Sequence, residues 1–116
     1  MEFIEAPVFT KYLSDYLVDD AFKNLQEALC HDPETGDVMQ GTGGFRKMRW
    51  QDSRRGKGKR GGLRVIYFYF ADDHQIWLLT IYGKDEMDDL TSEQKKTLKL
   101  AMQEEKQSRI IKKYKK

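Results

Sequence analysis

Two apolar runs of strand-forming residues in the second half of the chain restrict its fold more than any other feature. Residues 63–70 and 76–82 are rich in β-branched and aromatic side chains, and only the short segment 71–75 separates them. This pattern predicts an antiparallel β-hairpin. Because both runs are apolar on both faces, we expect them to lie centrally in a sheet that helices cover on at least one side.

The chain before this hairpin changes from a helical to a strand-like period. Residues 2–5 predict a short strand, and Pro7 suits the first turn of a helix whose apolar residues recur as far as residue 17. The acidic pair beginning at Asp19 predicts the start of a second helix, which Asp32 and Pro33 end. We expect the buried stripe of this helix to contain Val18, Phe22, Leu25 and Leu29. Residues 45–50 then alternate with a period of two, which predicts a further strand.

These elements together predict an α+β fold. We expect a small antiparallel β-sheet packed against the N-terminal helices, followed by a C-terminal helix that Thr91 or Ser92 can cap. Residues 1–105 are predicted to form a single domain. Residues 106–116 carry six bases and no acid, and we expect this basic C-terminal tail to be the frayed end of the last helix.

Charge is strongly segregated along the chain, although the net charge is only +2. Residues 43–64 carry nine basic side chains and a single acid, whereas residues 1–42 and 65–105 carry nine acids each and few bases. Such a basic block within an acidic chain indicates a polyanionic partner for that part of the molecule. Nucleic acid is the partner that this pattern favours.

Several classes of protein are disfavoured by the composition. The longest apolar run, residues 65–70, is too short to cross a bilayer, which needs roughly 20 residues. No signal pattern opens the chain, and the lone Cys30 cannot form an internal disulfide, so we expect a cytoplasmic protein with a buried thiol and no membrane contact. His31 and His74 have no metal-ligand spacing, and we therefore predict no metal and no other cofactor.

The basic strand–loop–strand between residues 43 and 64 is the most informative stretch for function. Alternation places Lys47 and Arg49 on one face of the predicted strand, and Arg64 opens the next strand, close enough to join them after pairing. The flanking and loop cations are predicted RNA contacts, and these are Arg46, Arg54, Arg55, Lys57, Lys59 and Arg60.

Converging cations can cleave RNA without metal or imidazole. The 2′-hydroxyl of RNA is an internal nucleophile, and positive side chains stabilise the pentacovalent phosphorane that its attack forms. A lysine surrounded by other cations gives up its proton more easily and can serve in acid–base catalysis.

Four stretches of this chain resemble the RelE/HigB toxin family of bacterial toxin–antitoxin systems, most closely its HigB-like branch. They keep the family's order and spacing, and they are residues 37–49, 56–67, 79–84 and 85–90. The resemblance implies a RelE-like fold and a ribosome-dependent messenger RNA endoribonuclease. Such an enzyme inhibits translation by 2′-hydroxyl attack, which leaves a 2′,3′-cyclic phosphate and a 5′-hydroxyl.

The resemblance also implies the catalytic residues. Lys47 and Arg49 stand where the family places strand lysines, Arg64 matches the arginine that opens the next strand, and Lys84 matches a basic residue after the last strand. Some relatives have a tyrosine where this chain has Thr91; Tyr82 either replaces it or packs in the sheet. We expect Lys84 to act as acid or base and Arg64 to stabilise charge.

The partners that the resemblance implies are a cognate antitoxin protein, the ribosome with messenger RNA, and promoter DNA bound only through the antitoxin. Two alternative functions remain. ParE-type toxins share the fold and inhibit DNA gyrase without nuclease activity, and a non-enzymatic RNA- or ribosome-binding module would need the same basic surface.

Overall fold

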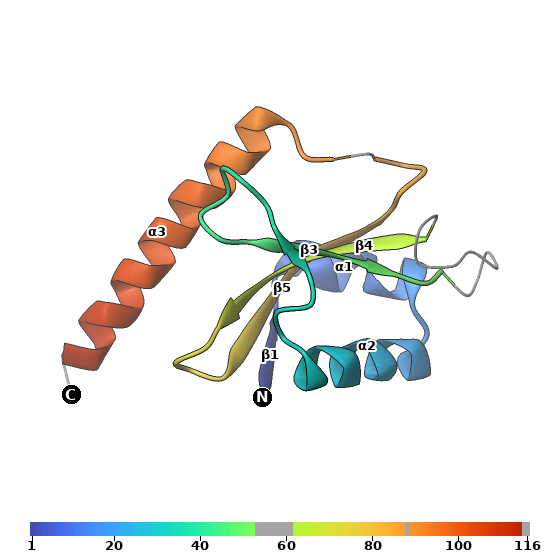
Figure 1. Cartoon of the computed structure of the whole chain (residues 1–116), viewed down its shortest axis with the longest axis horizontal. Coiled ribbons are helices and arrows are strands. Elements are labelled where there is room, and N and C mark those ends of the chain that lie inside the picture. The colour runs from blue at the N-terminus through green and yellow to red at the C-terminus, as the bar shows by residue number, and fades with distance from the viewer. Residues whose placement is uncertain (53–61, 88, 115–116) are drawn as a thin grey trace.

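The computed structural model describes residues 1–52, 62–87 and 89–114, and it has the predicted α+β architecture (Figure 1). A five-stranded sheet in the order β1-β5-β4-β3-β2 has helices on both faces. The elements are β1 Glu2–Glu5, α1 Pro7–Tyr16, α2 Asp19–His31, β2 Asp37–Val38, β3 Arg46–Trp50, β4 Leu63–Phe70, β5 Gln75–Gly83 and α3 Ser92–Tyr114.

The predicted central hairpin is confirmed, since β4 lies in the middle of the sheet and pairs antiparallel with β5 and β3. The expectation of a purely antiparallel sheet is wrong at one edge, because β1 pairs parallel with β5 from Glu2 opposite Gln75 to Glu5 opposite Leu78. That direction carries the chain from β1 into α1, which packs on β5. The register shifts between Ile66 and Tyr67, where a bulge on β5 changes which of its residues face each side.

Helices α1 and α2 cover one face of the sheet. Their fully buried Phe9, Leu25 and Leu29 pack with the inward residues of the strands, among them Trp50 and Tyr67. The Tyr67 hydroxyl accepts a hydrogen bond from the Gly36 N–H and donates one to the Pro33 carbonyl, which fixes the turn after α2. This layer is the main hydrophobic core.

The C-terminal helix α3 covers part of the opposite face. Met102 is buried there with an aromatic cluster of the sheet, which includes Phe45 and Phe68 at 5.5 Å between ring centroids. Trp77 packs at the border of this cluster, 6.3 Å from Phe70. The two tryptophans of the chain, Trp50 and Trp77, therefore lie against different helical layers.

The glycine-rich connection between β2 and β3 joins the sheet to α3, and the two lie side by side in Figure 1. The Thr42 hydroxyl donates to the Met39 carbonyl and accepts from the Phe45 N–H, which closes the loop. Gly43 has a φ of 79°, and a Cβ on it would stand 3.5 Å from the backbone of Lys99. The left-handed backbone favours glycine here, whereas a Cβ at this distance from α3 would make an ordinary van der Waals contact.

Helix α3 begins at a capping box and continues without a break across the predicted boundary at residues 105 and 106. Thr91 Oγ1 accepts from the Gln94 N–H, and Gln94 Oε1 accepts from the Thr91 N–H, so the predicted cap is confirmed. The prediction of a frayed end is wrong for residues 106–114, which are helical. Arg109 ties this half of α3 to the β4–β5 turn.

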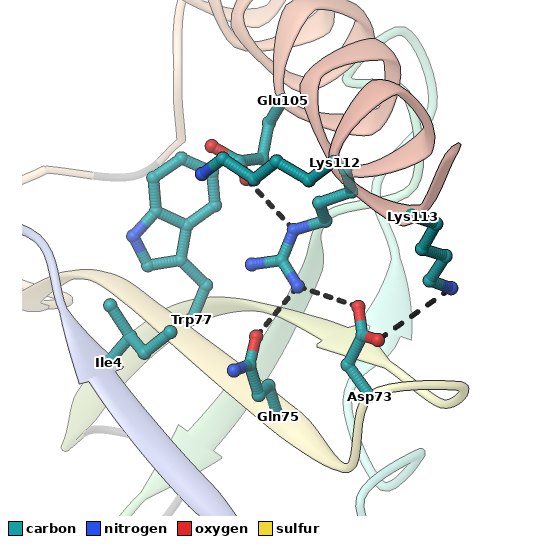
Figure 2. Close-up of a pocket in the computed structure, with 8 residues that line it drawn as sticks. Ile4, Asp73, Gln75, Trp77, Glu105, Lys112 and Lys113 are labelled. Atoms are coloured by element: carbon teal, nitrogen blue, oxygen red, sulfur yellow. Dashed lines mark hydrogen bonds and ion pairs between the residues drawn. The ribbon is translucent and has the colours of Figure 1, made fainter. Parts of the chain in front are cut away.

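The Arg109 side chain lines a pocket together with Asp73, Gln75 and Glu105, which are labelled in Figure 2, and these three residues supply acceptors that converge on its guanidinium. Its guanidinium donates to Asp73 at 2.8 Å, to Gln75 Oε1 at 2.6 Å and to Glu105 at 2.8 Å. It also stacks on the Phe70 ring at 3.7 Å from the centroid. A planar cation with this many partners holds the end of a helix that buries little apolar surface.

Two burial predictions are wrong. Val18 is 65% exposed because it precedes the first turn of α2 as its N-cap, outside the buried stripe that contains Leu25 and Leu29. Cys30 is exposed, since it follows Leu29 on the outward side of the last turn. Within the described ranges, no helix has both the length and the apolar character needed to cross a bilayer.

Candidate functional site

Four of the five predicted catalytic residues line one pocket of about 530 Å³ at the end of the sheet. Lys47 and Arg49 come from β3, Arg64 from the start of β4, and Lys84 from the turn after β5. The remaining walls of the pocket come from Thr35, Asp37 and Met48. The four cations, separated by up to 37 positions in the sequence, thus form one cationic concavity.

Strand register explains this convergence. Arg49 pairs with Arg64 across β3 and β4, and Arg64 pairs with Tyr82 across β4 and β5. Residues directly opposite in an antiparallel pair project from the same face, so these three side chains form a row. Lys47 is two residues before Arg49 and shares its face, whereas Met48 and Trp50 are buried in the core on the other side.

The four cations differ in how firmly they are held. Arg64 is 5% exposed, and its Nη1 donates to the Leu63 carbonyl. Lys47 is partly buried, while Arg49 and Lys84 are exposed. The pocket therefore has a rigid buried guanidinium at its base and cations that reach solvent at its rim.

The segment after β5 is tied to the rest of the molecule at several points. The Lys84 N–H donates to the Gly62 carbonyl at 3.0 Å, which holds Lys84 beside the start of β4. The Tyr16 hydroxyl donates to Glu86 at 2.6 Å and links this segment to α1. These contacts fix the position of Lys84 relative to Arg64.

Asp89 brings a carboxylate to the rim of the cationic surface. Its Oδ1 lies 3.4 Å from Lys47 Nζ, and its Oδ2 lies 3.4 Å from Lys95 Nζ at the start of α3. Partial burial opposes ionisation of Asp89, but the Leu90 N–H and the charges of Lys47 and Lys95 outweigh it and lower the pKa of this carboxyl. Asp89 is therefore an anion at neutral pH.

Tyr82, the fifth predicted catalytic residue, does not line the pocket. It is 6% exposed and packs in the cluster under α3, and its hydroxyl has no hydrogen-bond partner among the described residues. Burial raises the pKa of Tyr82, nearby Asp89 raises it further, and nearby Arg64 opposes both effects. Of the two alternatives for Tyr82, packing in the sheet fits this position better than a catalytic role.

Arg46 is a predicted RNA contact that the structure separates from the pocket. It lies on the other face of β3, donates to the Gly36 carbonyl at 2.9 Å and pairs with Glu34 at 3.2 Å. These contacts close the turn before β2. The other predicted RNA contacts, Arg54, Arg55, Lys57, Lys59 and Arg60, lie outside the described residues.

Sequence reasoning missed Asp89 as part of the site. The signal that could have identified it is its place in the sequence, as an acid between a basic strand and a basic helix start.

A scan against models of known protein families finds no match for this chain. Within residues 1–52, 62–87 and 89–114, no three or more His, Cys, Asp or Glu side chains are grouped so that they could hold a metal ion.

The arrangement is suited to holding a phosphodiester. Guanidinium groups can donate paired hydrogen bonds to two phosphate oxygens, and the ammonium groups add compact charge beside them. A pocket open to solvent at its rim admits a flexible strand, and a rigid arginine at its base can stabilise charge that develops on the phosphorus oxygens.

Proposed function

We propose that this protein is a toxin of the RelE/HigB type that cleaves messenger RNA on the ribosome and thereby inhibits translation. The observation that carries the proposal is the convergence of Lys47, Arg49, Arg64 and Lys84 on one pocket. The resemblance of residues 37–90 to that family supports it. The proposed setting is the cytoplasm, where a cognate antitoxin would cover the cationic pocket and link the toxin to promoter DNA.

The proposed reaction needs no group from outside the RNA and the protein. The 2′-hydroxyl oxygen attacks the adjacent phosphorus while a base takes its proton. The bond from phosphorus to the 5′-oxygen breaks, and that oxygen takes a proton from an acid. The products are a 2′,3′-cyclic phosphate and a 5′-hydroxyl.

The pocket suggests how the roles are divided. Arg64 is buried and held by the sheet, so it is suited to stabilising the phosphorane oxygens without reorganisation. Arg49 and Lys47 stand beside it and would hold the phosphate in place. Lys84 is exposed and lies across the pocket on a different element, where it can serve as the acid or base for a proton of the substrate.

The test is cleavage of a defined message in a purified translating system. The expected products end in a cyclic phosphate and begin with a 5′-hydroxyl, and they are identified by end-specific ligation. Lys84→Ala should lower the cleavage rate by roughly 10²-fold or more, as loss of a general acid or base does. Lys99→Ala is the matched control, because this exposed lysine lies on α3 away from the pocket.

One result would overturn the proposed function, and another would overturn the assignment of the catalytic residues to this pocket. One is an intact message at every ratio of protein to ribosome, with or without inhibited supercoiling by DNA gyrase. The other is full cleavage by both Lys84→Ala and Arg49→Gln, which would show that the catalytic residues of the protein lie outside this pocket.

A further inference from the structure

Beside the cationic pocket stands an anionic side chain, Asp89, which does not line the pocket but contacts one of its cations, Lys47. Asp89 bridges Lys47 of β3 and Lys95 of α3, with both nitrogen–oxygen distances at 3.4 Å. Neither contact is short, and the Asp89 side chain is 45% exposed. An ion pair of this length and exposure is weak and is readily exchanged for a better one.

Asp89 also has support that does not depend on Lys47. Its Oδ1 accepts a hydrogen bond of 2.7 Å from the Leu90 N–H, and Lys95 keeps its contact with Oδ2. If Lys47 turns to another anion, Asp89 therefore retains two partners. Lys47 is the member of the pair that lines the pocket with Arg49 and Arg64.

We propose that Asp89 is an internal competitor that occupies Lys47 in place of an RNA phosphate, and that RNA must displace it to bind. This inference rests on the proposed function and adds a control of affinity to it. A phosphate bound beside Arg49 and Arg64 would compete with Asp89 for Lys47. Binding then requires Lys47 to leave Asp89 for the phosphate; otherwise the repulsion between the two anions weakens binding.

Asp37 makes the proposal specific to one carboxylate. Asp37, unlike Asp89, lines the pocket, and it stands opposite Lys47 in the β2–β3 pairing, but no ion pair joins the two side chains within the described structure. Removing either acid changes the net charge equally. Only removal of Asp89 frees Lys47 from an ion pair.

The experiment measures binding of a fluorescent single-stranded oligoribonucleotide whose 2′-hydroxyls are methylated, so that it cannot be cleaved. Asp89→Asn keeps an oxygen that can accept from the Leu90 N–H and removes the charge. We expect it to bind this oligonucleotide roughly two- to fivefold more tightly at low salt, the range that a half-exposed ion pair allows. Asp37→Asn should change the affinity less, and thermal unfolding should verify that each variant is folded.

A double-mutant cycle with Lys47→Ala separates competition from a general effect of charge. In the Lys47→Ala background, Asp89→Asn should give no further gain in affinity. The inference is overturned if Asp89→Asn weakens binding, if its gain persists without Lys47, or if the wild-type protein does not bind the oligonucleotide at low salt. Failure of the proposed function would instead appear as binding without cleavage of a translated message.

Discussion

Arg49 and Arg64 lie directly opposite one another on β3 and β4, with both cationic side chains on the same face of the sheet. Like charges in this position oppose strand pairing by several tenths of a kcal/mol, roughly the scale of one cross-strand pair. A phosphate between the two guanidinium groups would turn that repulsion into attraction. The arrangement therefore favours binding of an anion at a cost in stability of the free protein.

The position of Arg49 opposite Arg64 predicts opposite effects on stability for substitutions of the two arginines of β3, Arg49 and Arg46. Arg49→Gln should weaken binding of single-stranded RNA and reduce the slope of log affinity against log salt by about 0.7, the value for one phosphate contact. It should also raise the free energy of unfolding by about 0.5 kcal/mol, because the cross-strand repulsion is gone. Salt titrations of binding and urea denaturation check the two effects.

Arg46→Gln is the matched control on the other face of the same strand. It loses the hydrogen bond to the Gly36 carbonyl and the ion pair with Glu34, so it should destabilise the protein by about 1 kcal/mol while the salt slope stays unchanged. A reduced slope in Arg46→Gln with no change in Arg49→Gln would contradict the assignment of the two faces.

The buried hydroxyl of Tyr82 predicts that its removal stabilises the protein. Because this group has no hydrogen-bond partner among the described residues, Tyr82→Phe removes a desolvated polar atom without breaking a bond. The free energy of unfolding should rise by about 1 kcal/mol, which chemical denaturation measures. Cleavage of a translated message should be retained, and a loss of more than tenfold would restore Tyr82 to the catalytic set.

The fold could be predicted in large part because its signals are local. The hairpin, the helix start at Pro7 and the cap at Thr91 each follow from a few adjacent residues. The convergence of Lys47, Arg49 and Arg64 also follows from alternation and strand pairing. These features need only the period of a strand and the geometry of an antiparallel pair.

The remaining features depend on contacts that a local pattern does not encode. The bulge on β5 places Trp77 and Tyr82, five residues apart, in the same apolar cluster, whereas strict alternation would separate them. The ion pair between Lys47 and Asp89 joins residues 42 positions apart in the chain. The order in the last part of α3 comes from Arg109 and its tertiary partners, whereas its lysine-rich sequence indicated fraying.

Arg109 should control how firmly the second half of α3 is attached. Arg109→Ala loses two ion pairs, a hydrogen bond to Gln75 and the stacking on Phe70, and we expect a loss of about 2 kcal/mol in unfolding free energy. Hydrogen exchange should accelerate across residues 103–114 more than in α2. Lys112→Ala, which removes an exposed cation from the next turn, should leave exchange unchanged.

Asp73 should make the same attachment sensitive to acid. The hydrogen bond from Arg109 lowers the pKa of Asp73 below its usual 3.8, against the smaller opposing effect of burial. A lowered pKa in the folded state contributes stability above about pH 4, and that contribution is lost as the pH falls through the lowered value. The stability difference between wild type and Asp73→Asn should therefore shrink between pH 6 and the strongly acidic range.

Urea denaturation at a series of pH values measures this difference, with Asp72→Asn as the neighbouring control. Asp72 lies on the same turn and is exposed, and no ion pair joins it to another described residue. Its substitution should produce no comparable pH dependence. An unchanged gap between wild type and Asp73→Asn down to pH 2 would contradict the role assigned to the ion pair.

The placement of Trp50 and Trp77 against different helical layers gives each side of the sheet its own intrinsic fluorophore. With Trp77→Phe, emission follows the layer formed by α1 and α2; with Trp50→Phe, it follows the layer beneath α3. Coincident transitions would mean that the two layers melt as one cooperative unit. Separate transitions would show that α3 unfolds as an independent cooperative unit. The end of the sheet that carries the cations could then be studied while that helix is unfolded.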